Sequence, residues 1–193
     1  MIVWRVCSAR GLKYLVDLRF RSVRSSPSYT LPMGKAMPSR RELIELTEAE
    51  ILDYLTSQKT LIIVSNGRDG YPHPMPMWFY RDDDGCLYCT TFGKSQKVYN
   101  WRRDPKATLL VESGEEYAEL KGAVIYATAE VIDDPDVIQE TLVNINSGGR
   151  ALSDEQRITL REAISTTAQK RVVLKFTPIR YVTWDHAKLN GQY

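Results

Sequence analysis

The residues most suited to chemistry lie in one short stretch, where a strand-like run gives way to a glycine and then to a predicted helix. Residues 89–97 read CTTFGKSQK and gather hydroxyl groups and lysines at that helix start. Backbone N–H groups and the positive end of the helix dipole favour an anion there. Lys97 would add a formal charge and Ser95 a hydroxyl donor. The pattern predicts a phosphate site, but a solvated helix start with Ser95 as its N-cap fits the same spacing.

Neighbouring residues are predicted to complete this site. Lys94 and Lys97 stand three positions apart on the predicted helix, where two positive charges repel each other unless an anion lies between them. Thr90, Thr91 and Gln96 supply further hydroxyl and amide groups, and we expect them to make secondary contacts with the anion.

A second unusual stretch, residues 72–81, is predicted to be extended although it contains three prolines. Pro72, Pro74 and Pro76 recur at every second position, so the N–H groups that they lack all belong to one edge of the strand. That edge cannot join a ladder of hydrogen bonds. We therefore expect something other than a neighbouring strand to lie along it.

Short helices are predicted around these stretches. Thr47 with Glu50 forms a capping box, which predicts a helix over residues 48–57 with its apolar face at Ile51, Leu52 and Leu55. Further helices are predicted at residues 94–103, after Asp134-Pro135, and at residues 153–169.

The remaining segments alternate strand-like runs with turn signals. Residues 117–133 are too long for one flat strand, and Gly122 in their middle predicts a bulge or a barrel corner. Pro178 divides the last apolar run into strands at 171–176 and 180–184. About six strands joined in sequence by tight turns favour a mainly β (α+β) antiparallel barrel with peripheral helices over a parallel α/β sheet.

Charge is distributed unevenly along the 193 residues. Residues 1–36 hold seven basic residues and one acid, a net charge of +6, which leaves 19 basic and 23 acidic residues, a net charge of −4, in residues 37–193. We expect residues 1–36 to be a basic extension, whether artefactual or disordered, a targeting segment, or an ordered addition to the domain at 37–193. An acidic domain does not fit a nucleic-acid partner.

The composition also indicates where in the cell the protein is expected. The longest apolar runs are too short to span a membrane, so no membrane association is expected. Three cysteines, an odd number, argue against a disulfide framework and for a reducing, cytoplasmic location.

Several ordered motifs resemble the flavin-binding split barrels of the pyridoxamine 5′-phosphate oxidase family, over roughly residues 37–193. The residues that carry the resemblance are the stretch DGYPHPMPMW at 69–78, the phosphate segment at 91–105, YAELKG at 117–122 and VTWDHAKL at 182–189. The family implies a split β-barrel that binds FMN or a deazaflavin (coenzyme F-420) at a homodimer interface. It implies that Ser95 and Lys97 hold the phosphate and that Met75, Pro76, Met77 and Trp78 form a platform for the ring.

The resemblance implies an FMN- or deazaflavin-dependent oxidoreductase that acts on a small molecule, with FMN favoured because no basic groove for a polyglutamate tail is evident. An arginine and a lysine that true pyridoxamine phosphate oxidases carry on the second strand are missing between His73 and Trp78, and Gln96 replaces another arginine. These departures argue against vitamin B6 oxidation. The alternative is a protein that binds or stores a flavin, a deazaflavin or haem without turnover.

Other candidate sites are weaker. Cys86 and Cys89 form a C-x-x-C, but three-residue spacing in a strand places the thiols on opposite faces, so no metal site is expected. His73 could line the flavin pocket and His186 could lie at the surface, or either could be structural. Asp82, Asp83 and Asp84 fit a solvated turn, while Trp78, Trp101 and Trp184 fit the core, with Trp78 or Trp184 as possible covers of the flavin ring.

Overall fold

The computed structural model describes residues 39–191. These residues belong to a compact unit spanning Met37–Tyr193; the predicted extension at 1–36 lies outside the described residues. The helices are α1 (Arg40–Ile44), α2 (Glu48–Ser57), α3 (Gln96–Arg103), α4 (Pro135–Ser147) and α5 (Asp154–Ala168), with short 3-10 turns η1 (Tyr117–Glu119) and η2 (His186–Leu189). The strands are β1 (Thr60–Asn66), β2 (Pro72–Trp78), β3 (Tyr80–Arg81), β4 (Leu87–Phe92), β5 (Lys106–Ser113), β6 (Lys121–Ile132) and β7 (Arg171–Asp185).

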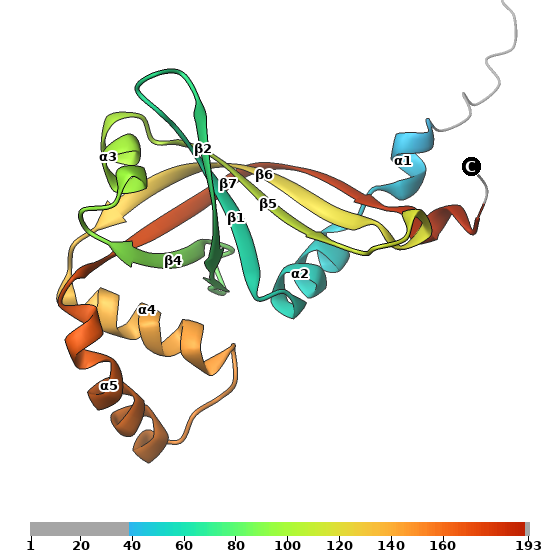
Figure 1. The fold of residues 1–193 in the computed structure, drawn as a ribbon. Helices are drawn as coiled ribbons and strands as arrows, with labels where there is room; N and C mark the ends of the chain where they lie inside the picture. Colours follow the sequence, from blue (N-terminus) through green and yellow to red (C-terminus); the bar gives the residue numbers. More distant parts are fainter. Residues whose placement is uncertain (1–38, 192–193) are drawn as a thin grey trace, which may run out of the picture. The chain divides into compact units, whose positions relative to one another are not determined.

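All seven strands form one antiparallel sheet in the order β2-β1-β5-β6-β7-β4-β3 (Figure 1). Its two end strands, β2 and β3, are consecutive pieces of chain, so the sheet curls back on itself. The predicted mainly β (α+β) split barrel is confirmed. The described residues form seven strands rather than about six. The extended segment at 72–81 is two strands, β2 and β3, because it changes its pairing partner at the buried Phe79.

The prolines explain why one end of this sheet is open. Pro72, Pro74 and Pro76 pair in register with Asn66, Val64 and Ile62 of β1, and β2 is the last strand of the order. The prediction of an unladdered edge is therefore confirmed.

The structure differs from two predictions about the long strands, the bulge at Gly122 and the division of the last strand at Pro178. Gly122 makes no bulge; it pairs with Trp184, and a Cβ added to it would lie 2.2 Å from the indole, so glycine is needed for close packing. The register shift instead lies between Tyr126 and Ala127, opposite Ile179. Pro178 sits at this irregularity inside one continuous β7, because its missing N–H is tolerated where the ladder is already interrupted.

Capping chemistry positions the helices largely as predicted. The capping box of Thr47 and Glu50 is formed and α2 covers 48–57, but Leu52 is 41% exposed and Tyr54 is buried in its place. Helix α3 starts at Gln96 rather than residue 94, since the preceding residues form a turn.

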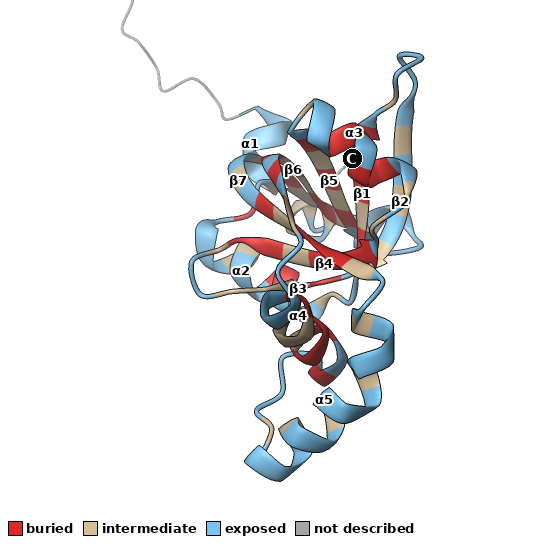
Figure 2. Ribbon diagram, turned by 90° about the vertical axis from the view of Figure 1, so that its left-hand side faces the viewer, coloured by how far each residue is buried: buried red, intermediate tan, exposed pale blue. Residues whose placement is uncertain are grey.

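The core fills the barrel and one helix closes its end. Strand side chains from alternate positions form the interior, and α3 adds Val98 (0% exposed) and Trp101 (3% exposed), whose indole meets Phe176 edge-on at 5.1 Å. Helix α4 packs on the outer side of β4 and β7, and α5 packs on α4 and β7. Figure 2 shows buried residues along the strands and on α3 and α4, whereas α5 is largely exposed. No helix among residues 39–191 is long and apolar enough to cross a membrane.

Candidate functional site

The start of α3 has the arrangement expected of an anion site. Ser95 occupies the N-cap position in extended conformation, but its side chain caps no helix N–H, which argues against the N-cap interpretation. Its Oγ instead lies 3.2 Å from Thr91 Oγ1. Two hydroxyls, one from β4 and one from the helix start, therefore meet at the place where the dipole of α3 is positive.

Lys97 is the unusual residue of this site. It is 7% exposed, and its Nζ donates to Thr91 Oγ1 at 3.1 Å. Burial lowers the pKa of this ammonium group, with Cys89 acting weakly in the opposite direction. Within the described part of the chain Lys97 takes part in no ion pair. A buried ammonium beside neutral hydroxyls is costly unless an anion compensates it, and a phosphate would do so.

The two predicted threonine contacts are separated by the alternation of β4. Thr91 faces the barrel interior with Cys89, next to Lys97. Thr90 faces the other side, where Arg171 Nη1 lies 3.3 Å from its Oγ1. Thr90 therefore does not share the pocket of Thr91, a consequence of strand alternation within the predicted segment.

The lysine pair is also divided. Lys94 is exposed in the turn before α3 while Lys97 is buried. The prediction that Lys94 and Lys97 repel each other three positions apart on one helix is wrong, because Lys94 precedes α3. Gln96 is exposed, and its Nε2 donates to Asn100 Oδ1 at 3.0 Å.

The predicted ring platform on β2 is split between two faces. Met75 and Met77 are partly buried and pack against the core. Pro76 and Trp78 point outward, and Trp78 is 55% exposed with Lys59 Nζ 4.3 Å from its ring centroid. A planar group along the outer face of β2 can therefore meet Pro76 and Trp78 but not the methionine side chains. The expectation that Trp78 lies in the core was wrong.

A group that the sequence interpretation missed lies beside the phosphate segment. Asn100 is 0% exposed; its Nδ2 donates to the buried Ser65 Oγ at 2.9 Å, which ties α3 to β1. Its Oδ1 accepts from Gln96 and, at 3.5 Å, from Arg103 Nη1. The sequence signal was its place on the inward face of the helix with Lys97 and Trp101.

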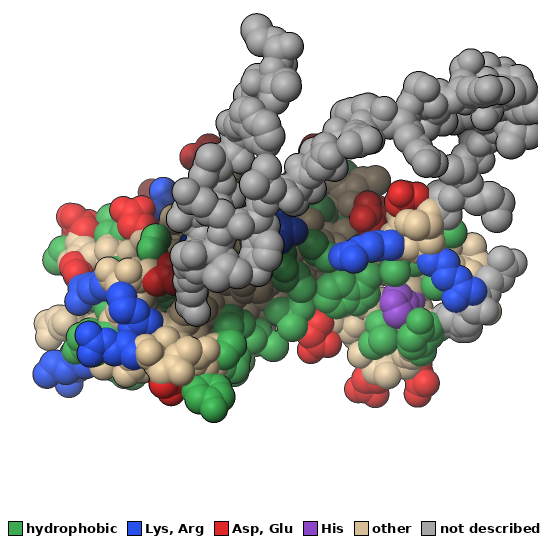
Figure 3. Space-filling view, turned by 90° about the horizontal axis from the view of Figure 1, so that it is seen from above, with side chains coloured by type: hydrophobic (Ala, Val, Ile, Leu, Met, Phe, Trp, Pro, Cys, Tyr) green, Lys and Arg blue, Asp and Glu red, His purple; other side chains and the backbone are tan. Residues whose placement is uncertain are grey.

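Asn100 thereby holds two side chains that line a cleft. The cleft has a volume of about 370 Å³ and is lined by Arg68, Gln96, Tyr99 and Arg103. Arg103 Nη2 also donates to the carbonyl of Asn66, which fastens the β1–β2 hairpin to α3. Figure 3 shows lysine and arginine side chains gathered at the end of the domain that carries α3 and this hairpin.

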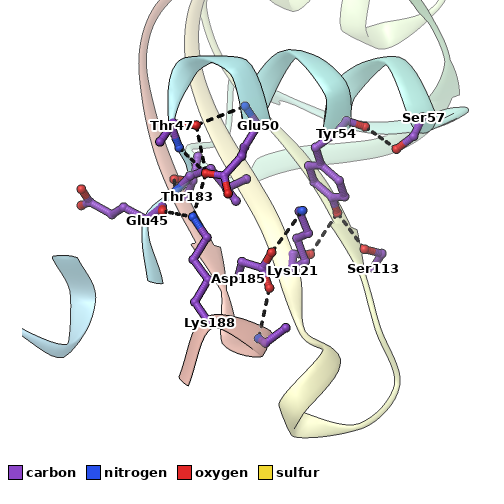
Figure 4. Close-up of polar contacts among 12 residues, drawn as sticks. Glu45, Thr47, Glu50, Tyr54, Ser57, Ser113, Lys121, Thr183, Asp185 and Lys188 are labelled. Carbon is purple, nitrogen blue, oxygen red and sulfur yellow. Dashed lines mark hydrogen bonds and ion pairs between the residues drawn. The ribbon is translucent and has the colours of Figure 1, made fainter. Parts of the chain in front are cut away.

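The C-terminal motif lies in a different polar cluster (Figure 4), at the end of the sheet opposite to α3 (Figure 1). Lys188 Nζ binds Glu50 Oε2 and the Glu45 carbonyl, both at 2.7 Å, while Lys121 pairs with Asp185 at 3.1 Å. The hydrogen bonds from Lys188 and Thr47 lower the pKa of Glu50 to about 2. The Lys188 contacts fasten α2 to η2, and the Lys121–Asp185 pair joins the ends of β6 and β7, so this cluster has a structural role.

Other candidates stay outside the α3 site. Cys86 and Cys89 are both buried thiols, and no group of three or more His, Cys, Asp or Glu among residues 39–191 could hold a metal ion. Asp82 accepts from the Cys86 N–H and from Tyr88, as a turn residue does. His186 Nδ1 lies 2.9 Å from the Tyr117 carbonyl, and His73 lies on the core-facing side of β2.

Comparisons with known proteins agree with this architecture. The family model described as Pyridoxamine 5'-phosphate oxidase matches residues 47–185. The conserved hypothetical protein Rv2991 from Mycobacterium tuberculosis is 32% identical, with a TM-score of 0.70, over 81% of this chain and 95% of that chain. No curated protein sequence matches the chain.

More distant structures share the fold. An F420 reductase is 18% identical, with a TM-score of 0.51, over 67% of this chain and 93% of its own. The heme storage protein HutZ from Vibrio cholerae is 15% identical, with a TM-score of 0.54, over 72% of this chain and 97% of its own.

Proposed function

The chain belongs to the pyridoxamine 5′-phosphate oxidase family, and from that premise we propose that it is an oxidoreductase that binds a flavin or deazaflavin at the start of α3. The phosphate of the cofactor would be held by Lys97, Ser95 and Thr91. The substrate would be a small molecule. Likeness to an F420 reductase supports a flavin-type cofactor.

The observation that carries this proposal is the buried Lys97. Its ammonium group has only a neutral hydroxyl as its hydrogen-bond partner among the described residues, at 3.1 Å from Thr91 Oγ1. Because burial penalises its charge, the site favours a ligand that supplies a negative charge at this point. A ribityl phosphate meets that requirement, and the hydroxyl of Ser95 can donate to it as well.

The protein's part in the chemistry is anchoring and orientation. When bound, the flavin or deazaflavin supplies hydride transfer at its ring. Lys97 and Ser95 fix the phosphate end, and the outward faces of Pro76 and Trp78 on β2 offer an apolar surface for a planar group. Backbone carbonyls on the proline edge of β2 are not paired with another strand, so they can accept hydrogen bonds from the ring.

We further propose that two copies of the chain associate through the outer face of the sheet. Five strands place apolar residues side by side across this face: Pro76, Ile62, Leu110, Val124 and Val182. Light scattering should give the mass of a dimer. Leu110→Lys should shift it to a monomer while Thr128→Lys, on an exposed position of β6, should not.

The test of the cofactor proposal is the visible spectrum of the purified protein, with mass spectrometry of any released chromophore. A bound flavin or deazaflavin, together with catalytic turnover when NAD(P)H or a reduced deazaflavin is the electron donor, would support the oxidoreductase. A bound chromophore without turnover would favour binding or storage, the alternative that likeness to HutZ supports. A protein that stays colourless after titration with FMN, deazaflavin and haem would refute both.

A further inference from the structure

We propose that the cleft between α3 and the β1–β2 hairpin binds a second anionic group, carried by the cofactor beyond its ribityl phosphate. The protein would then prefer a flavin-type cofactor with an anionic extension over FMN. This inference rests on the proposed function, since it assigns one end of the same cofactor.

The cleft has the chemistry of an anion site. Two guanidinium groups line it, Arg68 from the hairpin and Arg103 from the last turn of α3, together with the amide of Gln96 and the ring of Tyr99. Tyr99 is 53% exposed, so its ring is open to a ligand. Guanidinium groups bind phosphates and carboxylates with several parallel hydrogen bonds, and an exposed phenol ring packs against flat or aliphatic groups.

The cleft is held in shape before any ligand enters. The buried Asn100 amide accepts from both Gln96 and Arg103, and is itself anchored to Ser65 on β1. Arg103 also donates to the carbonyl of Asn66 in the hairpin. These contacts use part of the donor capacity of Arg103, and leave N–H groups of the guanidinium for a ligand. Asn100 is thus a positioning residue for this cleft.

One phosphate cannot serve both Lys97 and the cleft. Arg103 follows Lys97 by six residues, so its Cα atom lies about 9 Å farther along the axis of α3 at the α-helical rise of about 1.5 Å per residue. Lys97 points inward to Thr91 on β4, whereas Arg103 is exposed and turned to the hairpin. The cleft therefore fits a second anionic group. The part of the cofactor that joins this group to the first phosphate would pass Gln96.

Two cofactor chemistries provide such an extension. FAD carries a second phosphate followed by a planar base, and coenzyme F-420 carries a chain of carboxylates. FMN ends at its single phosphate and would leave Arg68 and Arg103 without a ligand. Both extensions carry negative charge beyond the first phosphate, which is the property that the cleft would recognise, so both cofactors serve as probes.

The experiment compares the dissociation constants of FMN, FAD and coenzyme F-420 by fluorescence titration. We expect FAD or F-420 to bind on the order of tenfold or more tightly than FMN, and Arg68→Ala to abolish that advantage while the FMN constant stays unchanged. The matched control is Arg102→Ala. Arg102 lies next to Arg103 in the last turn of α3 but pairs with Asp133 at 2.7 Å and does not line the cleft. Its removal should change none of the three constants.

Equal binding of all three cofactors by the unmodified protein would overturn the inference and leave the proposed function standing. Equal weakening of FMN and the extended cofactors by Arg68→Ala would also overturn it, because the arginine would then act on the common part of the ligand. If none of the three binds, the proposed function itself fails, and the inference fails with it.

Discussion

Replacing Lys97 with methionine should change binding and stability in opposite directions. Methionine keeps most of the aliphatic stem, but it removes the ammonium group that we place against the phosphate. Loss of a charged hydrogen bond costs about 1.5–3 kcal/mol, so the dissociation constant of FMN should rise about ten- to hundredfold. Thr91 loses a donor yet keeps the Ser95 hydroxyl at 3.2 Å, so no buried oxygen is left isolated.

The ligand-free protein should gain stability from the same change. Lys97 is 7% exposed and its pKa is lowered by burial, which means that its charge opposes folding in the absence of an anion. Removing that charge should stabilise the apoprotein by about 1 kcal/mol, or raise its melting temperature by roughly 2–4 °C for a domain of this size.

The assays are fluorescence titration with FMN and thermal melting of the apoprotein. Lys94→Met is the matched control, because it removes the same charge from an exposed position three residues earlier and should alter neither quantity substantially. An unchanged dissociation constant in Lys97→Met would refute the phosphate assignment. A melting temperature several degrees lower would show that Lys97 is needed for the fold and would refute the reasoning about its unpaired charge.

Two further predictions concern the frame around the site. Gly122→Ala should destabilise the protein by about 1–3 kcal/mol in denaturant unfolding, since the new Cβ would lie 2.2 Å from Trp184; a change within error would mean that the indole can move aside. Glu50 has a pKa lowered from 4.5 to about 2, so its contribution is present above pH 4.5 and lost as the pH falls towards 2. Lys188→Met should therefore reduce stability near neutral pH and flatten its decline across that window; parallel pH curves for the two proteins would contradict this role of the ion pair.

Much of the fold could be predicted from short-range chemistry. The capping box at Thr47 fixed the start of α2, and the prolines of residues 72–76 identified an edge strand before any partner was known. The glycine turn and the helix that carry Ser95 and Lys97 were likewise evident, because turns, caps and missing N–H groups depend on neighbouring residues alone.

Other features depend on which strands meet and how the sheet curls. The register placed Thr90 and Thr91 on opposite sides of β4, and the same alternation turned Met75 and Met77 inward while Trp78 faces out. The alternation of side chains could be predicted from the sequence, but what covers each face could not: α4 packs on one side of β4 and the barrel interior lies on the other.

The site itself shows the same division. The sequence by itself determined that hydroxyls and lysines gather at a helix start, because those residues are neighbours in the chain. Only the tertiary structure decided that Lys97 is buried and that Asn100 reaches Ser65, 35 residues away. The packing of α3 against β1 also placed Arg103 across the cleft from Arg68. Such contacts between distant residues follow from strand pairing and packing, which no local pattern encodes.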